Sequence, residues 1–272
     1  MGVARNRRVH EGTGPPPIAN QKALMAIRIL DCATMSPWFP RWHIGGTCLL
    51  VETDKGLVLV DTGLGLHDYS NPTRMVRFFW LDFGIHDDPE RAAVRQIARL
   101  GLVPESVRHI VMTHLHFDHA GGLPDFPHAH VHVHRREYEA MRHPRTWIEL
   151  AYDRSDFAHE PLWVLYDQPN AEWLGLEAIR LPFSPEMYLV PLFGHTRGHC
   201  GVAIREDNGW LFHCADALPT NAQFDVTPQW LNRLVLGPHV QRLQAWATAH
   251  PEVHLLAGHM WKSFFDEECR AA

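Results

Sequence analysis

Short apolar runs bounded by turn residues recur along the chain, and such runs are typical of β-strands. They lie at residues 26–30, 47–52, 56–61, 109–112, 129–134, 187–193, 201–205, 210–214 and 253–257. Lys55-Gly56 separates the second and third runs in the way that a hairpin turn does. The pattern therefore predicts a protein rich in short strands.

Amphipathic segments between these runs predict helices. Asp88 before Pro89 is typical of a helix start, and apolar residues follow at helical spacing until Gly101. Further helices are expected at residues 135–142, 228–236 and 240–247. Because strands and helices alternate in two similar halves, we expect a layered α/β protein. Residues 64–88 and 144–180 show no regular pattern.

The first 22 residues differ from the rest because they are polar and contain three consecutive prolines at positions 15–17. We expect a flexible N-terminal arm over residues 1–22, or an arm that packs on a partner subunit. No repeat or Gly/Ser linker divides the remainder, so residues 23–272 are predicted to form a single domain.

Composition excludes several classes of protein. Hydrophobic residues make up 46% and charged residues 21% of the 272 positions, which is the globular range. The net charge of −6 gives no basic footprint for nucleic acid, and no apolar run reaches the roughly 20 residues of a membrane span. The five cysteines form no CxxC motif and the start lacks a signal peptide, which favours the cytoplasm.

We expect the partner of this protein to be a small-molecule substrate. A homodimer is a further possibility that the sequence leaves open.

Histidine is abundant, with 21 residues, and four potential metal ligands cluster in one short segment. Residues 113–122 read Thr-His-Leu-His-Phe-Asp-His-Ala-Gly-Gly, which places His114, His116, Asp118 and His119 just after a predicted strand. Alternation in an extended segment sends His114 and His116 to one side, and a turn can send the other two to a second centre. Imidazole and carboxylate suit Zn²⁺ and other divalent ions, so the segment predicts a metal site.

Further candidate ligands follow later strands. Gly194-His195-Thr196-Arg197-Gly198-His199, then Asp216, then Gly258-His259 each come after an apolar run, and Asp61-Thr62-Gly63 follows an earlier one. Loops at the ends of strands are where α/β folds commonly place their ligands.

As a set, these motifs resemble the metallo-β-lactamase superfamily over about residues 45–262. The resemblance implies a four-layer αββα sandwich with metals at one edge, between the two sheets. It implies that one ion is held by His114, His116 and His199, a second by Asp118, His119 and His259, and both by Asp216. Asp61 would orient a ligand histidine, and His195 and Thr196 would shape the loop that presents His199.

Residues 113–122 and the segment Arg136-Glu-Tyr-Glu-Ala-Met141 look like the N-acyl-homoserine lactonases within that superfamily. The resemblance implies two divalent ions, zinc first, with manganese, iron or cobalt as alternatives. It implies that a metal-bridging hydroxide attacks the carbonyl of a lactone or ester, with Asp118 and Asp216 as the catalytic carboxylates. Pro219 stands where that group usually carries a tyrosine.

Other functions remain open on the same motifs, because a fold does not settle a substrate. The bond hydrolysed is alternatively that of a β-lactam, a thioester or a phosphodiester, for which Arg197 is the one basic residue beside the site. A mono-iron oxygenase and a non-catalytic binding protein are further alternatives, which the full ligand set disfavours.

Two other groups of residues attract attention. His128, His130, His132 and His134 alternate and are interpreted as a solvated edge face rather than an extra metal or pH-sensing patch. Phe78, Phe79, Trp80 and Phe83 are candidates for a pocket wall, ordinary core or a dimer surface.

Overall fold

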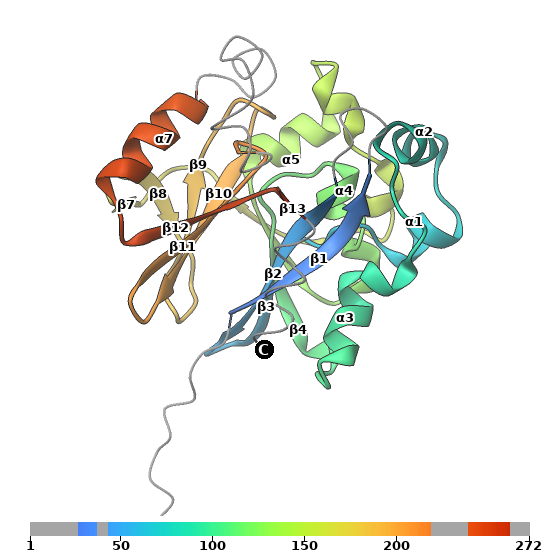
Figure 1. The fold of residues 1–272 in the computed structure, drawn as a ribbon, viewed down its shortest axis with the longest axis horizontal. Coiled ribbons are helices and arrows are strands. Elements are labelled where there is room, and N and C mark those ends of the chain that lie inside the picture. Colours follow the sequence, from blue (N-terminus) through green and yellow to red (C-terminus); the bar gives the residue numbers. More distant parts are fainter. Residues whose placement is uncertain (1–26, 37–42, 219–238, 262–272) are drawn as a thin grey trace, which may run out of the picture.

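In the computed structural model, two β-sheets pack against each other with helices outside them (Figure 1). The structure describes residues 27–36, 43–218 and 239–261. One sheet has the order β1-β2-β3-β4-β5-β6, with β13 also paired to β2, and the other has the order β12-β11-β10-β9-β8-β7. The strands of the first sheet are β1 (Ile27–Met35), β2 (Ile44–Thr53), β3 (Gly56–Val60), β4 (Val107–Val111), β5 (His130–His134), β6 (Leu162–Tyr166) and β13 (His259–Trp261). Those of the second are β7 (Ala171–Trp173), β8 (Leu176–Arg180), β9 (Met187–Pro191), β10 (Cys200–Glu206), β11 (Gly209–Ala215) and β12 (Val253–Ala257).

Most helices of the described chain lie outside the first sheet, whereas α7 lies outside the second (Figure 1). The α-helices are α1 (Leu66–Ser70), α2 (Arg74–Phe83), α3 (Ala93–Arg99), α4 (Phe117–Ala120), α5 (Arg135–Arg142) and α7 (His239–Ala249). Short 3₁₀ turns are η1 (Pro89–Arg91), η2 (Pro104–Ser106), η3 (Leu123–Asp125), η4 (Ile148–Ala151) and η5 (Arg154–Phe157).

Alternate residues of β2 enter different cores, which makes the first sheet an inner layer. Leu49 and Val51 join the cluster shared with β9, β10 and β11, whereas Cys48 and Leu50 join the cluster that contains Ile97 of α3. A strand buried on both faces is therefore covered by a sheet on one side and helices on the other. The four-layer αββα fold expected from the sequence is confirmed.

The segments without a clear pattern contain regular structure. Residues 64–88 include α1 and α2. The Thr73 hydroxyl caps the start of α2 by accepting a hydrogen bond from the Val76 nitrogen, and Gly84, with φ of 58°, caps its end. Residues 144–180 contain η4, η5 and three strands. The helix expected directly after Asp88 is interrupted, because Asp88 caps η1 and α3 begins only at Ala93.

The interpretation of the alternating histidines as a solvated edge face is wrong for His132 and His134, whereas His130 is exposed. Strand β5 lies between β4 and β6, and His132 and His134 are buried. His132 Nε2 lies 3.0 Å from His109 Nδ1, and its Nδ1 lies 2.9 Å from the Tyr166 hydroxyl. The His132 imidazole is therefore hydrogen-bonded inside the sheet and is not solvated.

Several expectations concern residues outside the described ranges, among them the arm over 1–22, the helix over 228–236 and Pro219. The single domain over 23–272 stays a prediction. Cys32, Cys48, Cys200 and Cys214 are buried free thiols. A search of the described helices finds none with the length and apolar character needed to cross a membrane.

Candidate metal centre

The loop after β4 carries four of the expected ligands. His114 and His116 are 0% and 4% exposed, and their ring centroids lie 4.7 Å apart. The extended backbone therefore brings both imidazoles to one side, as alternation predicts. His116 is the N-cap residue of α4, and this short helix contains Asp118 and His119.

Two glycines let this loop lie against the segment that follows β3. A Cβ at Gly121 would collide with Asp68 Oδ2, and a Cβ at Gly122 would lie 2.9 Å from the Thr62 Cβ. The Gly122 nitrogen also donates to the Gly63 carbonyl at 3.0 Å. The Gly-Gly pair in the motif thus has a packing reason.

Asp61 orients two of the histidines. Its φ is 55°, and its carboxylate accepts hydrogen bonds from the Thr113 nitrogen at 2.8 Å and the Thr113 hydroxyl at 2.7 Å. His119 Nδ1 donates to Asp61 at 2.9 Å. Since the Thr113 hydroxyl donates to Asp61, its oxygen accepts from His114 Nδ1 at 3.1 Å. In their neutral form both imidazoles therefore present an unprotonated Nε2 to the site.

Asp216 lies between two groups of ligand atoms. Its Oδ2 is 3.3 Å from His195 Nε2. Its Oδ1 is 3.4 Å from His119 Nε2 and 3.6 Å from His259 Nε2. His259 Nε2 is in turn 3.5 Å from Asp118 Oδ2. The two carboxylate oxygens thus face different partners.

The residues present fit divalent ions. Three overlapping sets offer ligand atoms that all lie within 4.8 Å of one another: His114, His116 and His195; His114, His119 and Asp216; and Asp118, His119 and His259. The Nε2 atoms of His114, His116 and His119 are buried, and none has a hydrogen-bond partner in the described chain. Buried nitrogens without partners are costly unless something binds them, and imidazole with carboxylate is a donor set that suits zinc.

His195 lies at the site together with His199, the ligand expected from the sequence. His195 Nε2 lies 3.1 Å from His116 Nδ1, within the first group. His199 is also buried, but its Nε2 accepts a hydrogen bond from the Asp216 nitrogen at 3.1 Å. The His199 Nδ1 atom is buried and has no hydrogen-bond partner among the described residues, so His199 as a metal ligand stays a prediction.

Burial and neighbouring charges set the protonation of the site. Burial, reinforced by adjacent imidazoles, lowers the pKa of His114 and His116 well below the ordinary value. Burial opposes the charged form of His119, yet the Asp118 and Asp216 charges raise its pKa. Burial likewise opposes ionisation of Asp216, but His195 and His119 hold its pKa well below its usual range. His114 and His116 are therefore kept neutral, whereas the carboxylates favour the charged form of His119, which must lose a proton to bind a metal.

Glu137 joins the two loops that carry the histidines, a role not evident from the sequence. This buried side chain accepts hydrogen bonds through Oε1 from the Leu115 nitrogen at 3.0 Å and the Tyr152 hydroxyl at 2.9 Å. Its Oε2 accepts from the Thr196 hydroxyl at 2.6 Å and the Gly198 nitrogen at 3.1 Å. Leu115 separates His114 from His116 in the chain, so one carboxylate positions ligands from both halves.

A pocket of about 470 Å³ opens beside His195, one of the candidate metal ligands. It is lined by Thr146, Trp147, Ile148, Glu149, Phe193, Gly194, His195, Thr196 and Arg197. Trp147, Ile148 and Phe193 give it an apolar wall next to His195. The Phe78 to Phe83 group lies elsewhere, on α2, where Phe79 stacks on Phe117 with ring centroids 5.1 Å apart.

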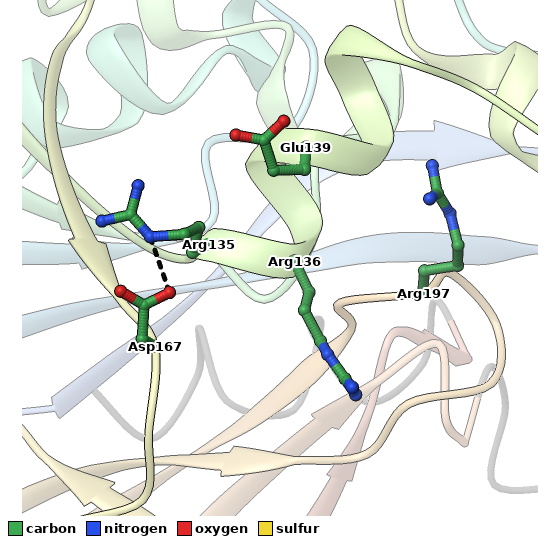
Figure 2. Close-up of a pocket in the computed structure, with 5 residues that line it drawn as sticks. All are labelled: Arg135, Arg136, Glu139, Asp167 and Arg197. Carbon is green, nitrogen blue, oxygen red and sulfur yellow. Dashed lines mark ion pairs between the residues drawn. The ribbon is translucent and has the colours of Figure 1, made fainter.

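A second pocket of about 440 Å³ adjoins the first, because Arg197 lines both. Figure 2 shows its lining, with Arg135 ion-paired to Asp167 at 2.6 Å. The Arg197 guanidinium donates to Glu149 at 2.7 Å. The Arg136 guanidinium instead lies 4.8 Å from the Phe193 ring centroid and pairs with no described carboxylate.

Comparison with known proteins identifies relatives over most of the chain. The family model of the Metallo-beta-lactamase superfamily matches residues 42–255. A probable metallo-hydrolase of Mycobacterium tuberculosis (strain ATCC 25618 / H37Rv) is 40% identical over 212 residues, which are 76% of this chain but only 64% of that protein. The N-acyl homoserine lactonase AttM of Agrobacterium fabrum (strain C58 / ATCC 33970) is 30% identical over 234 residues, covering 79% of this chain and 82% of that protein.

Solved structures share the fold. A quorum-quenching N-acyl homoserine lactone lactonase superposes with a TM-score of 0.61 at 21% identity, covering 86% of this chain and 91% of that chain. The dizinc quorum-quenching lactonase AidC gives a TM-score of 0.56 at 18% identity, covering 80% and 73%. With the family match over residues 42–255 and relatives named metallo-hydrolases and lactonases, the chain belongs to the metallo-beta-lactamase superfamily.

Proposed function

We propose that the protein is a hydrolase that uses two divalent ions to open a lactone or ester. The observation that carries the proposal is the position of Asp216, whose Oδ2 faces His195 while its Oδ1 faces His119 and His259. One carboxylate shared by two buried ligand groups is the arrangement that a two-metal site needs.

The proposed ligands divide into two sets. His114, His116 and His195 would hold one ion, Asp118, His119 and His259 the other, and Asp216 both. Zinc held there would lower the pKa of a bound water to about 7 and would polarise a carbonyl oxygen. The lactonase relatives support zinc, with manganese, iron or cobalt as alternatives.

The chain's own residues have three tasks in this proposal. Asp61 accepts the His119 Nδ1 hydrogen and so keeps Nε2 free as a ligand. His199 holds the Asp216 backbone in place. The Asp118 side chain is 16% exposed, against 2% for His119, which suits it to pass a proton to the leaving oxygen when the ring or ester opens.

The pocket beside His195 favours an uncharged carbonyl substrate with an apolar tail. Trp147, Ile148 and Phe193 offer apolar surface there, and the guanidinium of Arg197 is already paired with Glu149. The relatives named N-acyl homoserine lactonases support this substrate class. A phosphodiester is the second candidate, because Arg136 in the adjoining pocket has no carboxylate partner in the described chain.

The test is turnover by protein stripped with a chelator and then reloaded with Zn²⁺ or Mn²⁺. Acid release is followed from acyl-homoserine lactones, simple lactones, aryl esters, a thioester, a β-lactam and a phosphodiester. We expect chelator-sensitive opening of lactones or esters, lost in Asp216→Ala and retained in the control Asp207→Asn, at an exposed position in the turn between β10 and β11. Turnover of the phosphodiester alone would favour the second candidate, and turnover that survives metal removal would refute the metal-dependent mechanism.

A further inference from the structure

A second cluster of titratable side chains lies apart from the metal centre and shares no residue with it. His67 and Asp68 come from α1, Asp125 ends η3, Asp153 precedes η5, and Asp156 lies within η5. Asp68 and Asp156 are completely buried, and Asp153 is nearly so. Three separate segments therefore bring four carboxylates and one imidazole together.

Two buried oxygens of this cluster accept no hydrogen bond. Asp68 Oδ2 accepts from the Gly65 nitrogen at 2.9 Å, but Asp68 Oδ1 has no hydrogen-bond partner among the described residues. The same is true of Asp156 Oδ2. A buried carboxylate oxygen without a donor is unfavourable, and each such atom in a folded protein calls for an explanation, such as a bound ion.

The spacing of the polar atoms matches ligands of one ion. His67 Nε2 lies 3.3 Å from Asp68 Oδ1 and 3.2 Å from Asp156 Oδ1. A charge-assisted hydrogen bond between such groups is shorter, about 2.7–2.9 Å. Ligand atoms bound tetrahedrally at about 2.0–2.1 Å are instead separated by about 3.3 Å. One atom from each of the three residues lies within 4.8 Å of the others.

Carboxylates outnumber the cationic side chains that act on the cluster. His67 interacts electrostatically with Asp68, Asp156 and Asp125, and Arg95 interacts with Asp125. His67 is the imidazole that contacts the two fully buried carboxylates. Excess negative charge in a buried cluster is costly, and a bound cation offsets it.

We propose that His67, Asp68 and Asp156 form a third cation site, which takes a first-row divalent ion such as Zn²⁺ or Mn²⁺. A nitrogen ligand beside two carboxylates favours these ions over Ca²⁺ and Mg²⁺, which prefer oxygen alone. The His67 side chain is 29% exposed, so water completes the coordination from the open side.

The ion would join α1 to η5 beneath the loop that carries the main ligands. Asp68 lies directly against Gly121, the glycine that ends α4. The third ion therefore has a structural role, and the proposal does not depend on hydrolase activity.

The test counts ions on the full chain. Protein stripped with a chelator is dialysed at fixed free Zn²⁺, and separately at fixed Mn²⁺, and the metal content is measured by mass spectrometry. The variants are Asp156→Asn and His67→Ala, of which the second removes a partly exposed side chain and leaves every carboxylate. Asp125→Asn is the matched control, because it removes a charge from the same cluster outside the ligand group. Circular dichroism checks that each variant is folded.

We expect Asp156→Asn and His67→Ala each to bind one ion fewer per chain than the wild type, while Asp125→Asn binds the same number. Equal metal content in the wild type and His67→Ala would overturn the proposal. Loss of an ion in Asp125→Asn as well would overturn it too, since it would indicate diffuse attraction by negative charge. His116→Ala separates the two sites, because it weakens the main centre and leaves the third ion bound.

Discussion

Separate alanine replacements of His195 and His199 distinguish a metal ligand from a residue that positions one. His195 belongs to the ligand group that also contains His114 and His116, and its Nε2 lies 3.3 Å from Asp216 Oδ2. His199 Nε2 accepts the Asp216 N–H instead, at 3.1 Å. His195→Ala would remove a ligand atom, whereas His199→Ala would leave all proposed ligands present and loosen Asp216.

The expected magnitudes follow from these contacts. Loss of a residue that orients a ligand typically lowers metal affinity about 10- to 100-fold, which is about 1.4–2.8 kcal/mol. An unpaired buried backbone N–H costs a similar amount, about 1–3 kcal/mol. We expect His199→Ala to fall in this range and His195→Ala to lose at least about tenfold more affinity for one ion.

The assay is competition for Zn²⁺ against a chromophoric chelator, with each variant at the same protein concentration. His199→Gln serves as the matched control, because its amide oxygen can accept the Asp216 N–H and should recover most of the affinity lost in His199→Ala. The reasoning is refuted if His199→Ala loses an ion outright while His195→Ala retains both.

Three other predictions concern the surroundings of the site. Burial raises the pKa of Glu137 from 4.5 to about 7, so the protein loses stability as the pH rises from 4.5 through 7 and the carboxyl group ionises. Glu137→Gln should remove about 3 kcal/mol of the difference in unfolding free energy between pH 4 and pH 8, measured by urea unfolding of metal-free protein. Trp147→Ala should raise KM for long-chain acyl substrates more than for short ones in steady-state kinetics, and the exposed control Leu81→Ala should raise neither. Gly198→Ala should destabilise the protein by about 3 kcal/mol in thermal unfolding, because the added Cβ would collide with the Glu137 backbone. The control Gly101→Ala, at φ of 74° with open space around it, should cost about 1 kcal/mol, and equal effects of the two variants would contradict the steric argument.

Local pattern was sufficient for much of the fold and for part of the site. The strands predicted at 187–193, 201–205 and 210–214 correspond to β9, β10 and β11 within two residues at each end. Apolar runs bounded by turns indicate strands because burial drives their formation. The geometry of His114 and His116 was predictable for a similar reason, since backbone alternation over three residues is a local property.

Tertiary structure alone decided the features that depend on contacts between distant segments. The sequence Gly-His-Thr-Arg-Gly-His contains two histidines, and only the tertiary structure places one 3.3 Å from Asp216 Oδ2 and the other as acceptor of the Asp216 N–H. Glu137 contacts Thr196 across 59 positions, and His67 contacts Asp156 across 89. Hydrophobic periodicity records which face of an element is buried, whereas these polar contacts arise from how the buried elements are brought together. The sequence by itself therefore determined the elements and the local ligand motif, and the packing of the two sheets decided which side chains complete the site.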